Sequence, residues 1–471
     1  MSALTQPDPP HGDALWHAAP ESAGTAGLDT AGLDPAGSDT AGSDTAGTGR
    51  LGLLDGPPGL AGHLAAHGAL PVLDGEAILQ AVGSAGLTGR GGAAFPTERK
   101  LRAVADAGRA RRGGRTGVPV VVANACEGEP ASGKDHALLL RAPHLVLDGI
   151  ALAVRAVGAA NAYLCVHETD RAVLQNVDRA LAERRAAGID EVTVTVAGVP
   201  DRYVASEETS LVNLLDGGSA LPRFTPPRPF ERGVGGRPTL VNNAETLAHV
   251  ALIARHGAAW FRSAGTADAP GSALVTVSGA VRAPAVHEIP LGITVGELLA
   301  RCGGPTEPLQ AVLVGGYFGA WLPYSRALET RITPRALAAA GAAMGAGIFV
   351  ALPREACGLA ETARVARYLA EQSAGQCGPC VNGLPALAAA LEALALRGDR
   401  RAPDYIKNLI PFVSERGACR HPDGATRLIA SALTVFAQDV RGHLAQGPCR
   451  AARRTPLLPI PASTAATAGV R

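Results

Sequence analysis

The sequence predicts an α/β fold that continues into a small second module and ends in a helical bundle. Strand and helix patterns alternate in the first half of the chain, and residues 118–125 have the continuous apolar character of a buried strand. Further strand patterns begin near Gly271, and the last third has apolar residues at helical spacing. We therefore expect a sheet whose loops carry the chemistry at strand ends.

The composition predicts a soluble protein. The chain of 471 residues has a net charge of +1, which gives no broad attraction to nucleic acid or to anionic membrane. Eight irregularly spaced cysteines, with no apolar signal segment, favour the reducing cytosol over a disulfide framework. The longest uncharged run, residues 336–353, is mostly Ala and Gly, and we interpret it as a helix end, a turn and a strand at 348–352. We expect no direct membrane insertion and no nucleic-acid partner.

The first unit is preceded by a tail. Residues 1–50 are predicted to be disordered, because residues 26–45 repeat a five-residue pattern with almost nothing to bury. A patterned segment at 75–82 then leads into a glycine loop, and the buried strand at 118–125 follows. The next predicted elements are a helix and two strands, at residues 143–159, 162–167 and 191–197.

The second unit is predicted as two strands, a helix and a strand. Two strand patterns follow Gly271, Thr294 and Glu297 form a capping box that opens a short helix, and residues 311–315 return as a strand. Beyond it, apolar residues share a face in two helical runs: Leu384, Leu387, Leu391 and Leu394, then Ile429, Leu433, Phe436, Val440 and Leu444. These runs predict a helical bundle.

The glycine loop is a candidate phosphate cradle. Its sequence is G-R-G-G-A-A-F-P-T-E-R-K, with Gly89, Gly91 and Gly92 around Arg90 and with Lys100 at its end. Closely spaced glycines let backbone N–H groups approach an anion, and the cations supply charge. An ordinary turn is the alternative. The chain has three lysines, and Lys100 and Lys134 both fall in segments that resemble binding loops, whereas Lys407 does not.

A cluster of polar residues follows the buried strand. Asn124, Glu127 and Glu129 stand at or just past its end, and Lys134 and Asp135 come next. Carboxylates and an amide at a strand end are well placed to bind the hydroxyl and ring N–H groups of a nucleotide-like cofactor. A solvated acidic turn is the alternative.

Two further polar segments have both a ligand-binding and a capping interpretation. In Y-V-A-S-E-E-T, residues 203–209, Glu207 and Glu208 open a helix, where the helix dipole favours carboxylates without any ligand. In V-N-N-A-E-T-L, Asn242 and Asn243 precede a helix and could bind a phosphate or cap the helix.

The cysteines include one motif. Cys377 and Cys380 form a C-x-x-C, and Cys419 follows 39 residues later, which predicts a metal or redox site. Three thiolates are too few for a four-cysteine iron–sulfur site, and His421 would complete a set that also suits a structural zinc. The remaining thiols are expected to be packed or free: Cys126, Cys165, Cys302, Cys357 and Cys449.

These five segments in this order resemble the flavin-binding NADH dehydrogenase subunit of respiratory complex I and its relatives in NAD-dependent hydrogenases and formate dehydrogenases. The resemblance runs from about Leu60 to Leu444. It implies a Rossmann-like domain that binds FMN, a small β-grasp module and a helical bundle with a 4Fe-4S cluster. On this chain these would occupy residues 51–265, 266–335 and 336–450, with a flexible tail at 451–471.

The resemblance also implies roles for individual residues. The FMN would be held by Gly89, Arg90, Gly91, Gly92 and Lys100, with Asn242 and Asn243 at its phosphate, and by Asn124, Glu127, Tyr203, Ser206, Glu207 and Glu208 around its ring and ribityl chain. Phe95 and Glu129 would face NADH and serve the hydride transfer, and the cluster would be held by Cys377, Cys380 and Cys419.

The sequence departs from the family's pattern at several of these positions. Ala374 occupies the place of the first cluster cysteine, so His421, Cys357 or an exogenous ligand completes the site, the cluster has three irons, or it is absent. Cys126 replaces an aspartate near the flavin, and Arg228 replaces an aromatic residue near the nucleotide. Ala205 and Ser206 replace a cysteine and a glycine.

The leading hypothesis is a cytoplasmic flavoprotein oxidoreductase, which a partner could hold at the membrane periphery. It would accept a hydride from NADH on FMN and pass single electrons through an iron–sulfur site to a small iron–sulfur subunit or a ferredoxin. One alternative is an FMN-binding subunit that does not use NADH. Another is a non-catalytic assembly protein with zinc at three cysteines and His421.

Overall fold

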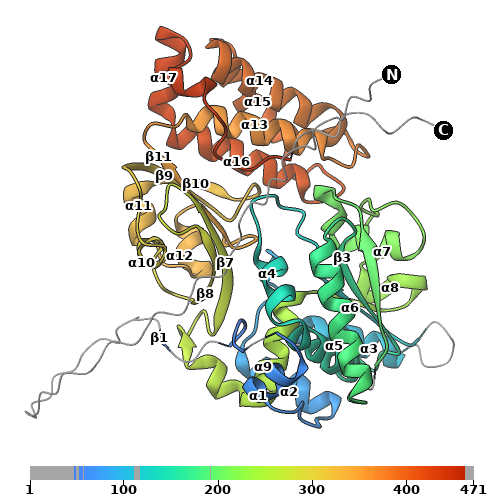
Figure 1. Cartoon of the computed structure of the whole chain (residues 1–471). Helices are drawn as coiled ribbons and strands as arrows, with labels where there is room; N and C mark the ends of the chain where they lie inside the picture. The colour runs from blue at the N-terminus through green and yellow to red at the C-terminus, as the bar shows by residue number, and fades with distance from the viewer. Residues whose placement is uncertain (1–46, 49–51, 57, 111–116, 191, 462–471) are drawn as a thin grey trace, which may run out of the picture.

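The computed structural model describes residues 47–48, 52–56, 58–110, 117–190 and 192–461. Figure 1 shows three groups of elements: an α/β unit with a four-stranded sheet, a second unit around a five-stranded sheet, and a group of helices at the top of the view. This agrees with the predicted fold class. The predicted disordered tail at residues 1–50 lies outside the described residues, except for β1 (Gly47–Thr48), which pairs with β6 (Ala264–Gly265).

The first sheet is entirely parallel, with the strand order β4-β3-β2-β5. Its strands are β2 (Val120–Asn124), β3 (Asn161–His167), β4 (Val194–Val199) and β5 (Thr239–Asn243). The chain builds outward from β2 to β4 and then returns to the other side of β2, so the direction of winding reverses between β2 and β5. Asn124 pairs with Asn243 at this reversal. Crevices outside the carboxyl ends of strands at such a reversal are the usual ligand sites of parallel sheets.

Helices cover both faces of this sheet, since apolar residues run through both faces of its strands. One face carries α5 (Pro143–Val157) and α9 (Ala244–Arg262), with α2 (Gly75–Ala85) and α3 (Thr97–Ala110) beside them. The other face carries α7 (Glu208–Leu215), with the 3₁₀ turn η1 (Tyr203–Ser206) before it. The remaining helices of the unit are α1 (Leu60–His67), α4 (Lys134–Arg141), α6 (Arg171–Ala186) and α8 (Pro229–Arg232).

A buried ion cluster that the sequence analysis missed holds the helices together. Asp148 on α5 accepts hydrogen bonds from Arg184 on α6 at 2.8 Å and from Arg255 on α9 at 2.5 Å. His63 on α1 lies 2.8 Å from the same carboxylate. Burial alone would raise the pKa of Asp148, but the hydrogen bond with His63 and the charges of Arg184 and Arg255 prevail and hold it well below its usual range.

The second sheet has the strand order β10-β9-β11-β7-β8. Its strands are β7 (Ser272–Gly279), β8 (Ala285–Pro290), β9 (Leu309–Val314), β10 (Ala320–Pro323) and β11 (Ile348–Pro353), and α10 (Val295–Arg301), α11 (Tyr324–Glu329) and α12 (Pro334–Ala339) accompany them. The strand expected at 348–352 is therefore central here, because β11 pairs with β7 in parallel and with β9 antiparallel. The sheet extends beyond the boundary predicted at residue 335.

The C-terminal helices form the predicted bundle around a separate core. They are α13 (Gly358–Glu371), α14 (Leu384–Arg397), α15 (Ala402–Val413), α16 (His421–Val435) and α17 (Ala437–Gln446), with a π-helical turn, η3 (Pro379–Gly383), before α14. The four leucines predicted to share a face of α14 are all buried. The second predicted run is divided between α16 and α17, because the chain leaves the helix at Phe436.

The prediction of a flexible tail at 451–471 is corrected over residues 451–461. Ala452 and Leu458 are buried against the bundle, and the backbone N–H groups of Leu457 and Leu458 both donate to Glu361 on α13 at 3.1 Å. A buried carboxylate that needs donors explains why this segment is docked. Residues 462–471 lie outside the described part of the chain.

One described helix, Pro379–Arg397, has the length and apolar character of a membrane span, and a bent pair, α4 with α5, passes the same test jointly. More than half of the apolar window of Pro379–Arg397 is buried inside the protein. These features are equally those of core helices.

Candidate functional site

The glycine loop is closed on itself and lies against the end of β5. Gly89 N–H donates to Phe95 O at 2.8 Å, and Thr97 N–H donates to Leu87 O at 2.9 Å. A Cβ on Gly91 would lie 3.4 Å from Asn243 Cβ, which is ordinary contact distance and shows that the loop lies against the strand end. The loop thus reaches the carboxyl edge of the sheet at the reversal between β2 and β5.

The two predicted cations of this loop have different positions. Arg90 is buried, and its guanidinium donates to Thr88 and to Ser272 O at 2.9 Å, so it points into the protein and holds the loop in place. Lys100 stays partly accessible, at 26% exposure, and pairs with Glu208 at 2.8 Å. Of the loop's two predicted cations, Lys100 is therefore the one available to an anion.

Lys134 is the centre of a second buried ion cluster, at the start of α4. Its Nζ lies 2.7 Å from Asp135 and 3.0 Å from Glu245, and it donates to Asn243 Oδ1 at 3.2 Å. Burial would raise the pKa of Glu245, but Lys134 prevails and lowers it to about 2. Burial dominates at Asp135, whose pKa is raised. Glu245 was not selected by the sequence analysis, although it stands inside the V-N-N-A-E-T-L motif.

The two asparagines of that motif play different parts. Asn243 caps α9 by accepting from Glu245 N–H at 3.1 Å and donates to Asp135 at 2.6 Å, as the capping interpretation predicts. Asn242 is buried, and its Nδ2 has no hydrogen-bond partner within the described residues. A buried amide donor without a partner is costly, and a bound ligand would satisfy it.

The polar residues after β2 contact the segment around η1. Asn124 Nδ2 donates to Ser206 O at 2.8 Å, and Glu127 accepts from Ser132 and from His136 N–H. A Cβ on Gly128 would lie 2.5 Å from Tyr203 O, so glycine is required for this close approach. Glu207 caps α7 through bonds to the N–H groups of Thr209 and Ser210, which confirms the capping interpretation.

Glu129 joins the first two units of the molecule, and its partner Tyr203 also contacts the helical bundle. It accepts from Tyr203 OH at 2.7 Å and from Tyr317 N–H, in the turn after β9, at 2.8 Å. Burial raises its pKa to about 7, against the lowering effect of these two donors. The Tyr203 ring contacts the edge of His421 on α16, with ring centroids 5.5 Å apart. Phe95, the other residue predicted to face NADH, is half exposed.

Two of the predicted metal ligands, Cys377 and Cys380, meet at one end of the bundle, and Cys419 lies near them without joining a group of three with metal-ligand spacing among the described residues. Cys377 Sγ lies 3.7 Å from Cys380 Sγ, and Cys380 accepts from the N–H groups of Gly375 and Ala374. Burial alone would raise the pKa of the Cys377 thiol, but N–H donors from Ala418 and Cys380 prevail and lower it. Cys419 interacts electrostatically with both thiols and with Glu207, and burial raises its pKa to about 11. This cysteine triad is therefore adjacent to the helix cap at the sheet edge.

Neither predicted fourth ligand lies at the cysteine triad. His421 Nε2 is bonded to Leu369 O at 2.7 Å, and among the described residues His421 forms no group of metal-ligand atoms with the cysteines. Cys357 stands before the 14 residues of α13 and the triad follows that helix, so about 20 Å of helix separates them. The proposed zinc site of three cysteines and His421 is thus not formed in this arrangement.

Three models of known protein families match segments of the chain. The Nuo51 FMN-binding domain matches residues 82–252, the SLBB domain matches 274–316, and the NADH-ubiquinone oxidoreductase-F iron–sulfur binding region matches 360–443. An F subunit of NADH-quinone oxidoreductase from Rhizobium meliloti is 31% identical over 402 residues, covering 82% of this chain and 93% of its own. The chain belongs to the family of NADH-quinone oxidoreductase F subunits.

Another F subunit and a solved structure also match most of this chain. The F subunit of Escherichia coli is 30% identical over 406 residues, with 82% of this chain and 88% of that protein covered. The crystal structure of an NAD⁺-reducing [NiFe]-hydrogenase in the H₂-reduced state matches with a TM-score of 0.73 and 32% identity over 79% of this chain. This match spans 63% of the hydrogenase chain, which is less than two thirds of its length.

The carboxyl ends of β2 and β5 with the glycine loop, which we call the crevice, fit FMN in donor chemistry. The flavin phosphate is an anion and needs a cation and N–H donors, and the crevice offers Lys100, the loop backbone and the unpartnered Asn242 amide. The cysteine triad fits an iron–sulfur cluster only in part, because Ala374 has no ligand atom and three thiolates leave one position of a four-iron cluster without a protein ligand.

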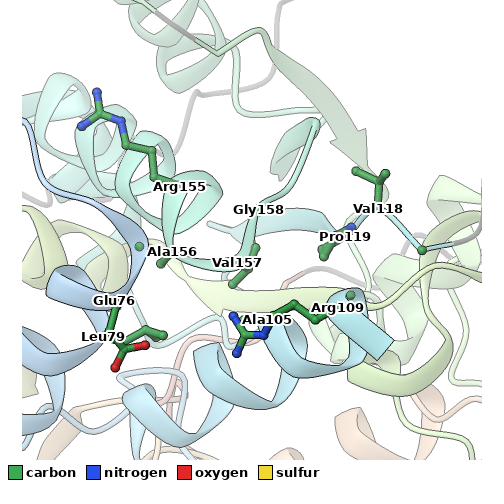
Figure 2. Close-up of a pocket in the computed structure, with 13 residues that line it drawn as sticks. Glu76, Leu79, Ala105, Arg109, Val118, Pro119, Arg155, Ala156, Val157 and Gly158 are labelled. Carbon is green, nitrogen blue, oxygen red and sulfur yellow. The ribbon is translucent and has the colours of Figure 1, made fainter. Parts of the chain in front are cut away.

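A cavity of about 320 Å³ lies elsewhere on the F-subunit homologue, near the amino end of β2. Figure 2 shows its lining, with Glu76 from α2, Arg109 from α3 and Arg155 from α5. Its lining also includes Gly117 and Pro119. Because ligands of parallel sheets bind at the carboxyl ends of strands, we assign the functional site to the crevice and not to this cavity.

Proposed function

We propose that this chain is the flavin-bearing subunit of an NADH-oxidising enzyme, which accepts a hydride from NADH on FMN and passes electrons through an iron–sulfur site to a protein partner. The observation that carries the proposal is the convergence of five distant segments. Lys100 bonds Glu208, Asn124 bonds Ser206, and Glu129 bonds Tyr203. Asn243 bonds Asp135, and Cys419 interacts with Glu207.

The proposed FMN site divides into ligands and supports. Lys100, the backbone of Gly91 and Gly92, and Asn242 would bind the phosphate. Arg90, Lys134, Asn243 and Glu207 are committed to the protein and would position the binding groups. FMN, when bound, would accept the two electrons of a hydride together and release them one at a time. This chain contributes binding, orientation and electrostatics.

Glu129 is the proposed proton-holding group beside the nicotinamide. Its pKa of about 7 lets the carboxyl gain or lose a proton at neutral pH, and Tyr203 OH and Tyr317 N–H stabilise the ionised form. Phe95, half exposed, would provide the apolar surface for the ring of NADH. Because the same carboxyl contacts the second sheet, protonation there is coupled to the position of that unit.

The partner is proposed to be a small iron–sulfur subunit or a ferredoxin-like protein that binds next to the cysteine triad. Val381 follows Cys380 directly and is 57% exposed, and Phe412, in the helix that packs on this turn, is 72% exposed. Tyr405 lies two turns before Phe412 on the same helix and is also exposed. We place the protein in the cytoplasm, and at the membrane periphery only through such a partner.

The proposal is tested by anaerobic flavin binding and reduction. Purified chain is titrated with FMN and then with NADH, and flavin absorbance is followed. We expect binding, and bleaching by NADH. Lys100→Ala should weaken FMN about 10- to 100-fold, because it removes a charge-assisted contact of about 1.5–3 kcal/mol. Lys407→Ala, which removes an exposed lysine, is the control and should have no effect. Absence of FMN binding to the wild-type chain contradicts the proposal.

A further inference from the structure

Two cysteines and a histidine meet at the end of the bundle opposite the cysteine triad. Cys357 caps α13, His443 lies on α17, and Cys449 begins the docked C-terminal segment. Cys357 Sγ lies 3.8 Å from His443 Nε2, and the three ligand atoms all lie within 4.8 Å of one another. Among the described residues, no other set of three or more His, Cys, Asp or Glu side chains meets this condition.

The donor set and its spacing are those of a tetrahedral zinc ion. Zinc bonds of about 2.3 Å to sulfur and about 2.0 Å to nitrogen put tetrahedral ligand atoms roughly 3.5–3.8 Å apart. The Cys357–His443 separation of 3.8 Å already has this value. Two thiolates and an imidazole select zinc over magnesium or calcium, which require oxygen ligands. Three protein ligands leave the fourth position to water.

The surroundings provide both enclosure and access. Cys357 and His443 are buried, whereas Cys449 is exposed, so an ion can enter from its side. Cys449 N–H donates to His443 Nε2 at 3.2 Å, and metal binding would take over the lone pair that accepts this bond. Asp439 lies one helical turn before His443 and interacts with it electrostatically, which adds a negative charge near the proposed cation.

We propose that Cys357, His443 and Cys449 bind a zinc ion that fastens the C-terminal segment to the helical bundle. The segment is held at two further points, by Glu361 on the first turn of α13 and by Tyr317 OH, which donates to Pro459 O. The zinc would fix its beginning at the same helix end. This structural role is independent of the electron path, because α13 separates the two cysteine sites.

The test uses the full chain in a Cys377→Ser/Cys380→Ser background, which removes the competing triad. Protein is purified under reducing, anaerobic conditions, and bound zinc is counted; cobalt replaces zinc to report tetrahedral thiolate coordination by absorption. We expect about one ion per chain. In the same background, Cys449→Ser and His443→Gln should reduce the count to near zero. Cys302→Ser is the matched control, because Cys302 lies 3.3 Å from His287 Nε2 without a third ligand among the described residues.

A second measurement, of tryptic cleavage, tests whether zinc fastens the C-terminal segment. Zinc should slow tryptic cleavage at Arg450, Arg453 and Arg454 several-fold, and a chelator should remove the protection in the parent but not in Cys449→Ser. Because Cys449 is exposed, its substitution leaves the packed core intact. The proposal is overturned if the parent binds no zinc, if Cys449→Ser binds it equally well, or if Cys357 and Cys449 are found as a disulfide instead.

Discussion

The flavin crevice and the cysteine triad differ in how completely the protein builds them. In the crevice, Lys134, Asp135, Glu245 and Asn243 bind one another in a buried cluster, and the glycine loop is bonded beside it through Arg90 N–H and Thr246. At the triad, three thiols lie at the edge of the bundle and Ala374 stands where a fourth would be. The charged groups of the first site are paired with one another within the protein, whereas the second has no fourth cysteine among its predicted ligands.

This difference predicts which substitutions change ligand binding together with stability and which change metal content alone. A crevice made of buried charges loses several partners when one is removed, because each carboxylate depends on the same lysine. The triad depends on three separate side chains with few shared partners. We therefore expect substitutions in the crevice to change stability and binding together, and substitutions at the triad to change metal content alone.

The largest expected effect comes from Lys134→Ala. Removing the ammonium group leaves Asp135 and Glu245 buried without their cation, which should lower the free energy of unfolding by about 3–5 kcal/mol and abolish FMN binding. Urea unfolding monitored by circular dichroism measures this. Lys407→Ala should change stability by no more than about 0.5 kcal/mol. If the two variants were equally stable, the buried charge cluster would not stabilise the crevice, and the contrast with the cysteine triad would be wrong.

A pH dependence of stability follows from Glu129. Its folded pKa of about 7 exceeds the ordinary value of 4.5, so the folded state binds more protons between these values, and stability falls as pH rises from about 4.5 to 7. The loss is on the order of 3 kcal/mol. Glu129→Gln should flatten the unfolding free energy across this range and also alter the pH dependence of flavin reduction by NADH.

The matched control for Glu129 is Glu288, a carboxyl outside the crevice. It accepts from Ser272 and from Leu53 N–H, and burial raises its pKa to about 7 as well. Glu288→Gln should flatten the stability curve in the same sense without changing the pH dependence of flavin reduction. If both variants changed the pH dependence of flavin reduction in the same way, the change would result from altered stability. Glu129 would then have no specific role in the reduction.

The smallest expected effect on the fold comes from Ala374→Cys. Ala374 is half-buried and its N–H bonds Cys380, so the new thiol would stand beside the triad, and stability should change by no more than about 0.5 kcal/mol. Iron and acid-labile sulfide per chain after anaerobic reconstitution should increase, with a matching change in the EPR spectrum. An unchanged cluster would show that the wild-type site already has a fourth ligand.

The sequence predicted the fold class, the order of the units and the placing of polar residues such as Asn124 at strand ends. These follow from apolar periodicity and from the rule that ligands bind at strand ends. Helix capping by Asn243 and Glu207 was one of the two interpretations that their positions offered, and the structure shows both caps. Both belong to local structure, which a sequence encodes directly.

Long-range charge pairing could not be predicted in the same way. Nothing local in the sequence indicates that Arg90 turns inward to Ser272, that Lys134 pairs with Glu245, or that Asp148 binds two arginines from different helices. The meeting of Cys357 with Cys449 likewise spans 92 positions and depends on how α17 packs. Burial and partner are properties of the packed state.

The central claim is that the crevice between β2 and β5 binds FMN and that NADH reduces it there, independently of the triad. The most direct measurement is an anaerobic NADH titration of the FMN-loaded wild type and of Cys377→Ser/Cys380→Ser, following flavin absorbance. We predict complete bleaching with equal NADH stoichiometry at the flavin in both proteins, and no bleaching in Lys134→Ala. A flavin that binds to the wild type but stays oxidised in excess NADH would contradict the account.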